Sequence, residues 1–102
     1  MRFFLKKINL EDGNLSLSSY IGGLLRIIRY ESGLSGEQLA KSINISQQQV
    51  SRYERGETGF QLDMLFRFLS ALRMNESEKQ YFFYQIVNKA REIPQYQFGK
   101  YE

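Results

Sequence analysis

The chain of 102 residues contains 42% hydrophobic and 15% aromatic residues, enough apolar material for one folded domain with a single core. It has no cysteine and no histidine, which excludes a disulfide framework, a thiolate metal site and the usual general base. The formal net charge is only +3, so bulk charge barely supports binding to nucleic acid. We therefore expect a binding protein without a cofactor, and not an enzyme.

Residues 1–17 form the N-terminal segment and allow more than one interpretation. Apolar residues alternate with polar ones on both sides of an Asp-Gly pair, which is a hairpin signal. An irregular arm laid over helices fits the same residues equally well. Arg2, Lys6 and Lys7 also allow a basic arm that reaches into a minor groove. We describe this segment as an N-terminal arm or hairpin.

A first helix is predicted over Tyr20–Ser32. Ser18 or Ser19 can cap its start, and Gly33 can end it. Apolar residues recur at intervals of three and four and mark the stripe expected in the core: Ile21, Leu24, Leu25 and Ile28. The nine-residue run YIGGLLRII within this helix is too short to span a bilayer and contains an arginine, so we expect a cytoplasmic protein without a membrane span.

The stretch Ser35–Gly56 predicts two short helices joined by a tight corner. Ser35 can cap the first helix, in which apolar residues fall at helical spacing. Asn44 suits the corner because asparagine tolerates the left-handed conformation that a helix exit often needs. Ser46 can cap the second helix, predicted over Gln47–Arg55, and the glycine that follows can end it.

The second of these helices has a polar outer face. Val50, Tyr53 and Glu54 face one way. The residues that face out are Gln47, Gln48, Ser51, Arg52 and Arg55. Glutamine can pair bidentately with adenine and arginine with guanine, and serine can donate to a phosphate. The segment therefore predicts a helix-turn-helix that binds DNA, although the glutamine run alone also fits an ordinary solvated helix face.

The run LSGEQLAKSINISQQQVSRYERG resembles the Cro/repressor-like (XRE) helix-turn-helix family. The resemblance extends from about residue 20 to residue 75 and includes the leucine-rich segment LDMLFRFLSAL. It implies an all-α, lambda-repressor-like bundle of five helices, whose third helix enters the major groove, usually within a two-fold dimer. The run SQQQVSRYERG is also similar to small regulators encoded with fimbrial operons in enteric bacteria.

The resemblance also assigns roles to single residues. It places the base contacts at Gln47, Gln48 and Arg52. It places the loop that grips phosphate at residues 55–59, and we expect contacts to the DNA backbone from Ser46, Ser51, Arg55 and Thr58. In this family the positions of Arg29 and Glu54 form an ion pair between the first helix and the end of the recognition helix. A buried carboxylate needs such a two-pronged partner.

Two positions depart from the family pattern. The family usually has a glutamine that contacts phosphate at the start of its second helix, where this chain has Gly36. The loop after the recognition helix is usually basic and closes with proline, whereas this chain reads Glu57-Thr58-Gly59-Phe60. We therefore expect less help from charge in this loop.

The C-terminal part predicts two further helices. The helix over Gln61–Arg73 carries a stripe that we expect in the core: Leu62, Leu65, Phe66, Phe68, Leu69 and Leu72. Asn75 and Glu78 fit a capping box for a fifth helix, which runs to about Glu92 and is ended by Pro94.

Aromatic residues cover more than one face of the fifth helix and continue into the tail at residues 95–102. One face can cover the bundle, and the other needs a second cover, for which another copy of the chain is the natural candidate. The residues expected at this dimer interface are Phe82, Phe83, Ile86, Tyr96 and Phe98. The tail can dock in a groove or add a strand across the interface, or else fray in solvent.

These observations divide the chain into an arm at 1–17, a DNA-binding core at 18–75 and a dimerisation segment at 76–102. The leading hypothesis is a homodimeric regulator that binds double-stranded DNA at a roughly palindromic operator. The alternative is an antitoxin-like module that binds a protein partner, with weak or secondary DNA binding. The acidic loop and Gly36 favour the alternative, and the polar face of the recognition helix favours the first.

Overall fold

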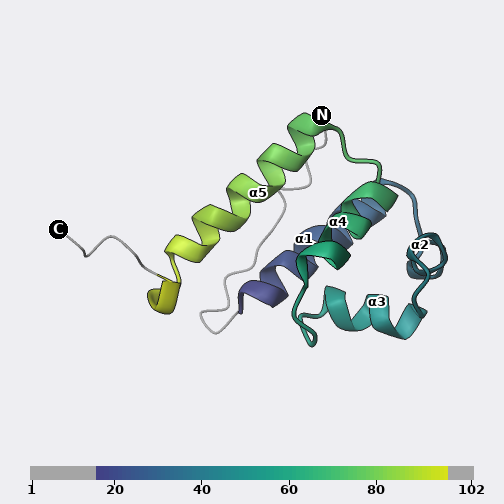
Figure 1. Ribbon diagram of the computed structural model, residues 1–102, viewed down its shortest axis with the longest axis horizontal. Helices are drawn as coiled ribbons and strands as arrows, with labels where there is room; N and C mark the ends of the chain where they lie inside the picture. The colour runs from purple at the N-terminus through teal and green to yellow at the C-terminus, as the bar shows by residue number, and fades with distance from the viewer. Residues whose placement is uncertain (1–15, 97–102) are drawn as a thin grey trace.

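The computed structural model describes residues 16–96, which form five α-helices and a short 3-10 helix (Figure 1). The elements are α1 (Leu17–Glu31), α2 (Gly36–Ile43), α3 (Gln47–Glu54), α4 (Leu62–Ala71), α5 (Glu76–Arg91) and η2 (Pro94–Tyr96). The predicted all-α bundle is confirmed. Phe98 and nearly all of the predicted arm or hairpin lie outside the described residues.

The first helix begins earlier than predicted. Its N-cap is Ser16, whose hydroxyl oxygen accepts a hydrogen bond from the backbone N–H of Ser19 at 3.1 Å. The prediction of a cap at Ser18 or Ser19, with a start at Tyr20, is therefore wrong. Three serines within four residues can all cap a helix chemically, so the sequence pattern did not select among them. The end is as predicted, since Gly33 has a φ of 74°.

The corner between α2 and α3 follows the prediction closely. Asn44 adopts the left-handed conformation, with φ 60° and ψ 45°. A capping box begins each helix: Ser35 and Gln38 exchange two hydrogen bonds at the start of α2, and Ser46 and Gln49 do the same at the start of α3. Both ends of the corner are thus fixed by short-range hydrogen bonds.

The helices pack around a single core. In Figure 1, α1 and α4 lie between α5 on one side and α2 with α3 on the other. α1 contacts both α3 and α5, and α2 contacts α3 and α4. The largest fully buried side chains include Phe68, Phe82, Leu24, Leu25 and Ile28. Phe82 is therefore unavailable to a second copy, and its predicted place in a dimer interface is corrected.

The stripe predicted for α4 is only partly buried. Leu65, Phe68 and Leu69 lie in the core, as does Leu72 directly after the helix. Leu62 is 71% exposed and Phe66 is 49% exposed, so their predicted burial is wrong. These two residues lie one turn apart along one edge of the stripe, where the described part of the chain covers them only in part.

Candidate nucleic-acid interface

The outer face of α3 presents the side chains that the sequence predicted. Gln47, Gln48, Arg52 and Arg55 are exposed, and Ser51 is half-buried. Together with Glu57, these five residues line an open hollow of about 450 Å³. The hollow is polar and opens toward solvent on the side of α3 that faces away from the core.

The three consecutive glutamines at the start of α3 are not equivalent. The side-chain oxygen of Gln49 accepts a hydrogen bond from the backbone N–H of Ser46 at 3.1 Å, so Gln49 belongs to the cap. The hydroxyl oxygen of Ser46 accepts from the backbone N–H of Gln49, also at 3.1 Å. This leaves Gln47 and Gln48 as the two glutamines available to a ligand. The hydroxyl predicted to contact the DNA backbone, that of Ser46, is engaged in the cap.

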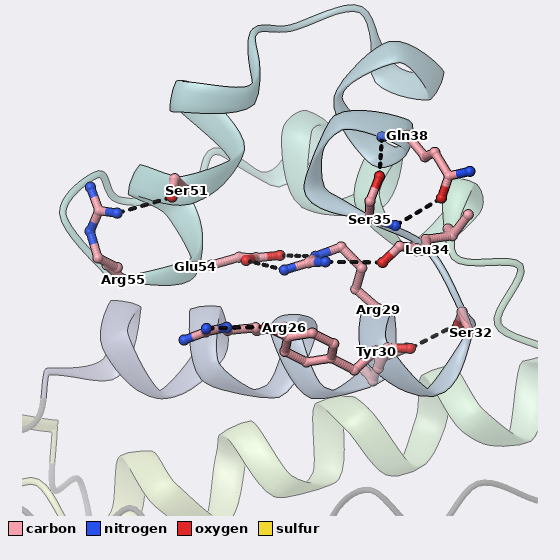
Figure 2. Close-up of polar contacts among 11 residues, drawn as sticks. Arg26, Arg29, Tyr30, Ser32, Leu34, Ser35, Gln38, Ser51, Glu54 and Arg55 are labelled. Carbon is pink, nitrogen blue, oxygen red and sulfur yellow. Dashed lines mark hydrogen bonds and ion pairs between the residues drawn. The ribbon is translucent and has the colours of Figure 1, made fainter.

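The inner side of α3 is fixed to α1 by a buried ion pair. Arg29 Nε lies 2.6 Å from Glu54 Oε2, and Arg29 Nη2 lies 2.9 Å from Glu54 Oε1. The remaining nitrogen, Nη1, donates to the backbone carbonyl of Leu34 at 3.0 Å, so one guanidinium joins α1, the α1–α2 connection and the last residue of α3 (Figure 2). The hydrogen bond to Glu54 raises the pKa of Arg29 above its ordinary value. The geometry of the predicted pair is present in full.

Two glycines allow α1 and the end of α3 to approach closely. A Cβ atom at Gly22 would lie 2.2 Å from the backbone oxygen of Tyr53 and 2.7 Å from that of Glu54. At Gly56, whose φ is 75°, a Cβ atom would lie 2.4 Å from Ser19 Cα. Backbone packs directly against backbone at both points, so these positions exclude any larger residue.

Aromatic packing holds the loop that follows α3. The rings of Tyr53 and Phe60 stack with centroids 4.7 Å apart, and both meet the buried ring of Phe68 at 5.5 Å. Phe60 stands at the position where the resembled family closes the loop with proline. Here ring packing fixes the loop, which places Thr58 and Glu57 beside the end of the recognition helix.

Arg55 is engaged by its own loop. Its Nε donates to Glu57 Oε2 at 2.7 Å and its Nη2 donates to Glu57 Oε1 at 3.2 Å. Its Nη1 donates to the hydroxyl oxygen of Ser51 at 2.9 Å, as Figure 2 shows. The two charged side chains are 54% and 51% exposed. The hydrogen bond from Arg55 lowers the pKa of Glu57, so this carboxyl is ionised at neutral pH.

A helix-turn-helix family model matches residues 25–79, slightly more than half of the chain. The chain belongs to the helix-turn-helix family of the Cro/repressor (XRE) type. No curated protein matches closely enough to add to this assignment. The match runs from α1 into the first turn of α5 and therefore contains the whole outer face of α3 as part of a DNA-binding helix-turn-helix domain.

Some residues of this helix-turn-helix were missed by sequence reasoning. The pattern Ser-x-x-Gln occurs at both 35–38 and 46–49 and could have identified the two capping boxes. Arg67 on α4 donates a hydrogen bond to the backbone carbonyl of Ile43, the last residue of α2, and so supports the corner between α2 and α3. No sequence signal predicts that bond, because it joins residues 24 positions apart.

None of the helices in residues 16–96 combines the length and apolar character that a bilayer crossing requires.

Proposed function

We propose that this chain is a sequence-specific transcriptional regulator that reads double-stranded DNA with α3 in the major groove. The observation that carries the proposal is the outer face of α3, where Gln47, Gln48 and Arg52 are exposed while the opposite side of the helix is anchored to α1. In this proposal Gln48 pairs with adenine and Arg52 with guanine, and Gln47 contacts a base or a phosphate at the start of the helix.

In this proposal the contacts to the DNA backbone come from the C-terminal half of α3 and the loop that follows it. Ser51 and Arg55 lie beside Arg52 along the same hollow, and Thr58 lies in the adjoining loop. Near the other end, Gly36 lies next to Gln47, since a Cβ at position 36 would be 3.8 Å from the Gln47 side chain. Phosphate contacts set position and orientation, whereas the base contacts carry the sequence information.

We propose further that the regulator is a homodimer, so that two copies of α3 enter successive major grooves about 34 Å apart and read a roughly palindromic operator. The surface that supports a dimer is the apolar strip, which we define as Leu62, Phe66, Phe83 and Val87. Leu62 and Phe66 are one turn apart on α4, and the ring of Phe66 lies 5.6 Å from that of Phe83 on α5. Val87, one turn beyond Phe83, is 50% exposed.

The charges beside the apolar strip suit a second copy of the same chain. Asp63 and Arg67 are both exposed and are spaced one turn apart, next to Leu62 and Phe66, and Arg67 also donates to the backbone carbonyl of Ile43. In a two-fold interface the same patch faces itself, so an acidic residue of one copy can meet the basic residue of the other. Of the residues originally predicted for the interface, Phe83 belongs to this strip and Ile86 is half-buried. Tyr96 lies in η2, which contacts α5.

DNA reading is tested by selecting bound duplexes from a random pool at two salt concentrations and then measuring the affinity of an Arg52→Ala variant. We expect a loss of about 1–3 kcal/mol and relaxed specificity at one base position. Arg91→Ala is the matched control, because Arg91 is an exposed arginine in the last turn of α5, and α5 lies on the other side of α1 from α3 (Figure 1). If Arg52→Ala binds the selected duplex as tightly as the parent, the assignment of the base-reading residues is wrong.

The dimer is tested by sedimentation of a Leu62→Gln, Phe66→Gln double variant. We expect the parent to sediment as a dimer and the variant as a folded monomer, because polar side chains remove the apolar contact area at the strip. Tyr30→Ser is the control, since Tyr30 is a 60% exposed aromatic residue on α1 outside the strip. A monomeric parent chain at concentrations that saturate DNA would contradict the dimer.

A protein partner other than a second copy is the alternative occupant of the apolar strip. It corresponds to the antitoxin-like function, and the exposed side chains of Leu62 and Phe66 are the observation that favours it. A parent chain that is monomeric, fails to shift any duplex at low salt and co-purifies with a second protein would support this alternative. The cytoplasmic location and the fimbrial-operon type stay predictions.

A further inference from the structure

The phosphate-facing end of the candidate interface already contains an anion. The guanidinium of Arg55 holds the carboxylate of Glu57 through two parallel hydrogen bonds, of 2.7 and 3.2 Å. A guanidinium takes up phosphate through the same pair of N–H groups and with the same fork geometry. Glu57 therefore occupies one of the paired N–H edges by which Arg55 can hold a DNA phosphate, while Nη1 donates to Ser51.

We propose that Glu57 competes with the DNA backbone for Arg55 and so lowers the affinity of the regulator for every duplex. This inference rests on the proposed function, in which the outer face of α3 lies against DNA. Glu57 shares the hollow with Gln47, Gln48 and Arg52, so a phosphate that reaches Arg55 also meets the Glu57 carboxylate. Binding then exchanges the Arg55–Glu57 pair for an Arg55–phosphate pair and leaves a carboxylate beside the DNA.

The local structure makes this competition both persistent and reversible. Only Gly56 separates the two residues, and the aromatic packing of Tyr53 with Phe60 on either side fixes the loop, so the carboxylate stays close to the guanidinium. The pair is about half exposed, and exposed ion pairs are weak. A phosphate of the duplex can therefore open it. Glu57 controls affinity without contacting a base, and we expect it to act equally on all sequences.

The first experiment measures duplex affinity by fluorescence anisotropy for the parent, Glu57→Gln, Arg55→Gln and the double variant. Both a duplex recovered by selection and a random-sequence duplex are used. We expect Glu57→Gln to tighten binding about two- to fivefold on both duplexes, the range that an exposed ion pair can supply. In the Arg55→Gln background the same substitution should give a much smaller gain, because the competition needs both partners.

The control for net charge is Glu92→Gln. Glu92 is the C-cap of α5 and pairs with Lys89 at 3.3 Å, so this variant also removes one exposed, paired carboxylate. We expect its duplex affinity to stay within the error of the parent. A gain from Glu57→Gln that is equally large in the presence and absence of Arg55 would show simple repulsion between Glu57 and DNA, and would overturn the proposal. So would no gain at all.

A second measurement uses no DNA and separates this proposal from the proposed function. The Nε–Hε signal of Arg55 is followed by NMR while inorganic pyrophosphate is added to the parent and to Glu57→Gln. We expect the Arg55 signal to have a different chemical shift in Glu57→Gln than in the parent. We also expect it to saturate in Glu57→Gln at a pyrophosphate concentration about two- to fivefold lower than in the parent. That result, together with no duplex binding by either chain, would show that Glu57 competes with a phosphate anion for Arg55, but it would reject DNA reading and with it an effect of Glu57 on duplex affinity. Unchanged pyrophosphate binding would reject the competition even if the parent binds DNA.

Discussion

Arg29 joins three segments of the described part of the chain through a single side chain. It donates from three nitrogens, two to the Glu54 carboxylate and one to the Leu34 carbonyl. Arg29 is 7% exposed and Glu54 is 9% exposed, so water provides little compensation if either partner is lost. A buried ion pair contributes little net stability relative to apolar residues, but removal of one partner strands a buried charge.

We therefore expect Glu54→Ala to lower the free energy of unfolding by about 3–5 kcal/mol. The double variant Arg29→Met, Glu54→Leu should recover most of this loss, because no buried charge remains. It should not recover all of it, since the Leu34 carbonyl loses its donor. Urea unfolding of both variants and the parent checks this expectation. A double variant no more stable than Glu54→Ala would contradict the role given to the stranded Arg29 charge.

Single-residue burial was the least predictable property of this sequence. Leu62 and Phe66 share the helical spacing of the buried leucines in α4 but lie at the edge of the stripe, and spacing alone does not show where a neighbouring element ends. Phe82 was expected at a dimer interface and lies fully in the core. The pairing of Arg55 with Glu57 depends on how the loop closes, which ring packing by Phe60 determines.

At the scale of elements, short-range hydrogen bonds define where helices begin. Capping boxes start α2, α3 and α5, with Ser35, Ser46 and Asn75 as N-caps. These starts were predicted from the sequence because a cap involves residues only three apart. The start of α1 was not predicted, since several adjacent serines satisfy the same rule. The corner was predicted because asparagine is one of few residues that adopt the left-handed conformation of Asn44.

The cap of α3 provides a test of how the recognition helix is held. We expect Ser46→Ala to destabilise the fold by about 0.5–2 kcal/mol, because the N–H of Gln49 loses its acceptor. Ser70→Ala, an exposed serine within α4, is the control and should change stability by less than about 0.5 kcal/mol. Thermal unfolding and amide hydrogen exchange at Gln47 and Gln48 are measured for both variants and for the parent. Equal stability of the two variants would show that the cap does not hold α3.

At the scale of the whole molecule, the packing of α5 on α1 includes a titratable group. Tyr20 is 8% exposed and lies at this contact, with Lys89 Nζ 5.6 Å from its ring centroid. Burial raises the pKa of Tyr20 above 10.0, and the charge of Glu92 and the nearby Tyr81 add to the effect. Tyr30 differs, because the hydrogen bond from Arg26 and its charge lower the pKa of that exposed phenol.

We expect this difference to appear as alkaline destabilisation. A raised folded-state pKa means that the folded chain retains the Tyr20 proton longer than the unfolded chain does. The contribution of Tyr20 to the free energy of unfolding is therefore complete below about pH 10, the pKa of tyrosine in the unfolded chain. It is lost as the pH rises through the folded-state pKa. Urea unfolding from pH 8 to 11 should show a decline that Tyr20→Phe reduces. NMR titration should show Tyr30 losing its proton before Tyr20, and the opposite order would contradict the assignment.

The overall architecture was predictable, whereas the surfaces were predictable only in part. Helical periodicity, caps and the motif at residues 35–56 were sufficient to predict the order of the helices and most of the face by which each of α1 to α4 packs in the core. The apolar strip joins α4 to α5, and the Arg55–Glu57 pair joins the end of α3 to its loop. The strip arises where two helices meet, so no local pattern contains it, whereas Arg55 and Glu57 are close in sequence but pair only because of how the loop after α3 folds.

The attachment of α3 to α1 has a consequence for the duplex itself. The Arg29–Glu54 pair and the close backbone contacts at Gly22 and Gly56 restrict the movement of α3 relative to α1. A rigid protein surface obliges the double helix to supply any bending or twisting that docking demands. Base steps that deform readily are then favoured even where no side chain touches them. For the proposed dimer, we expect duplexes selected from a random pool to show sequence bias at the central positions that no side chain touches.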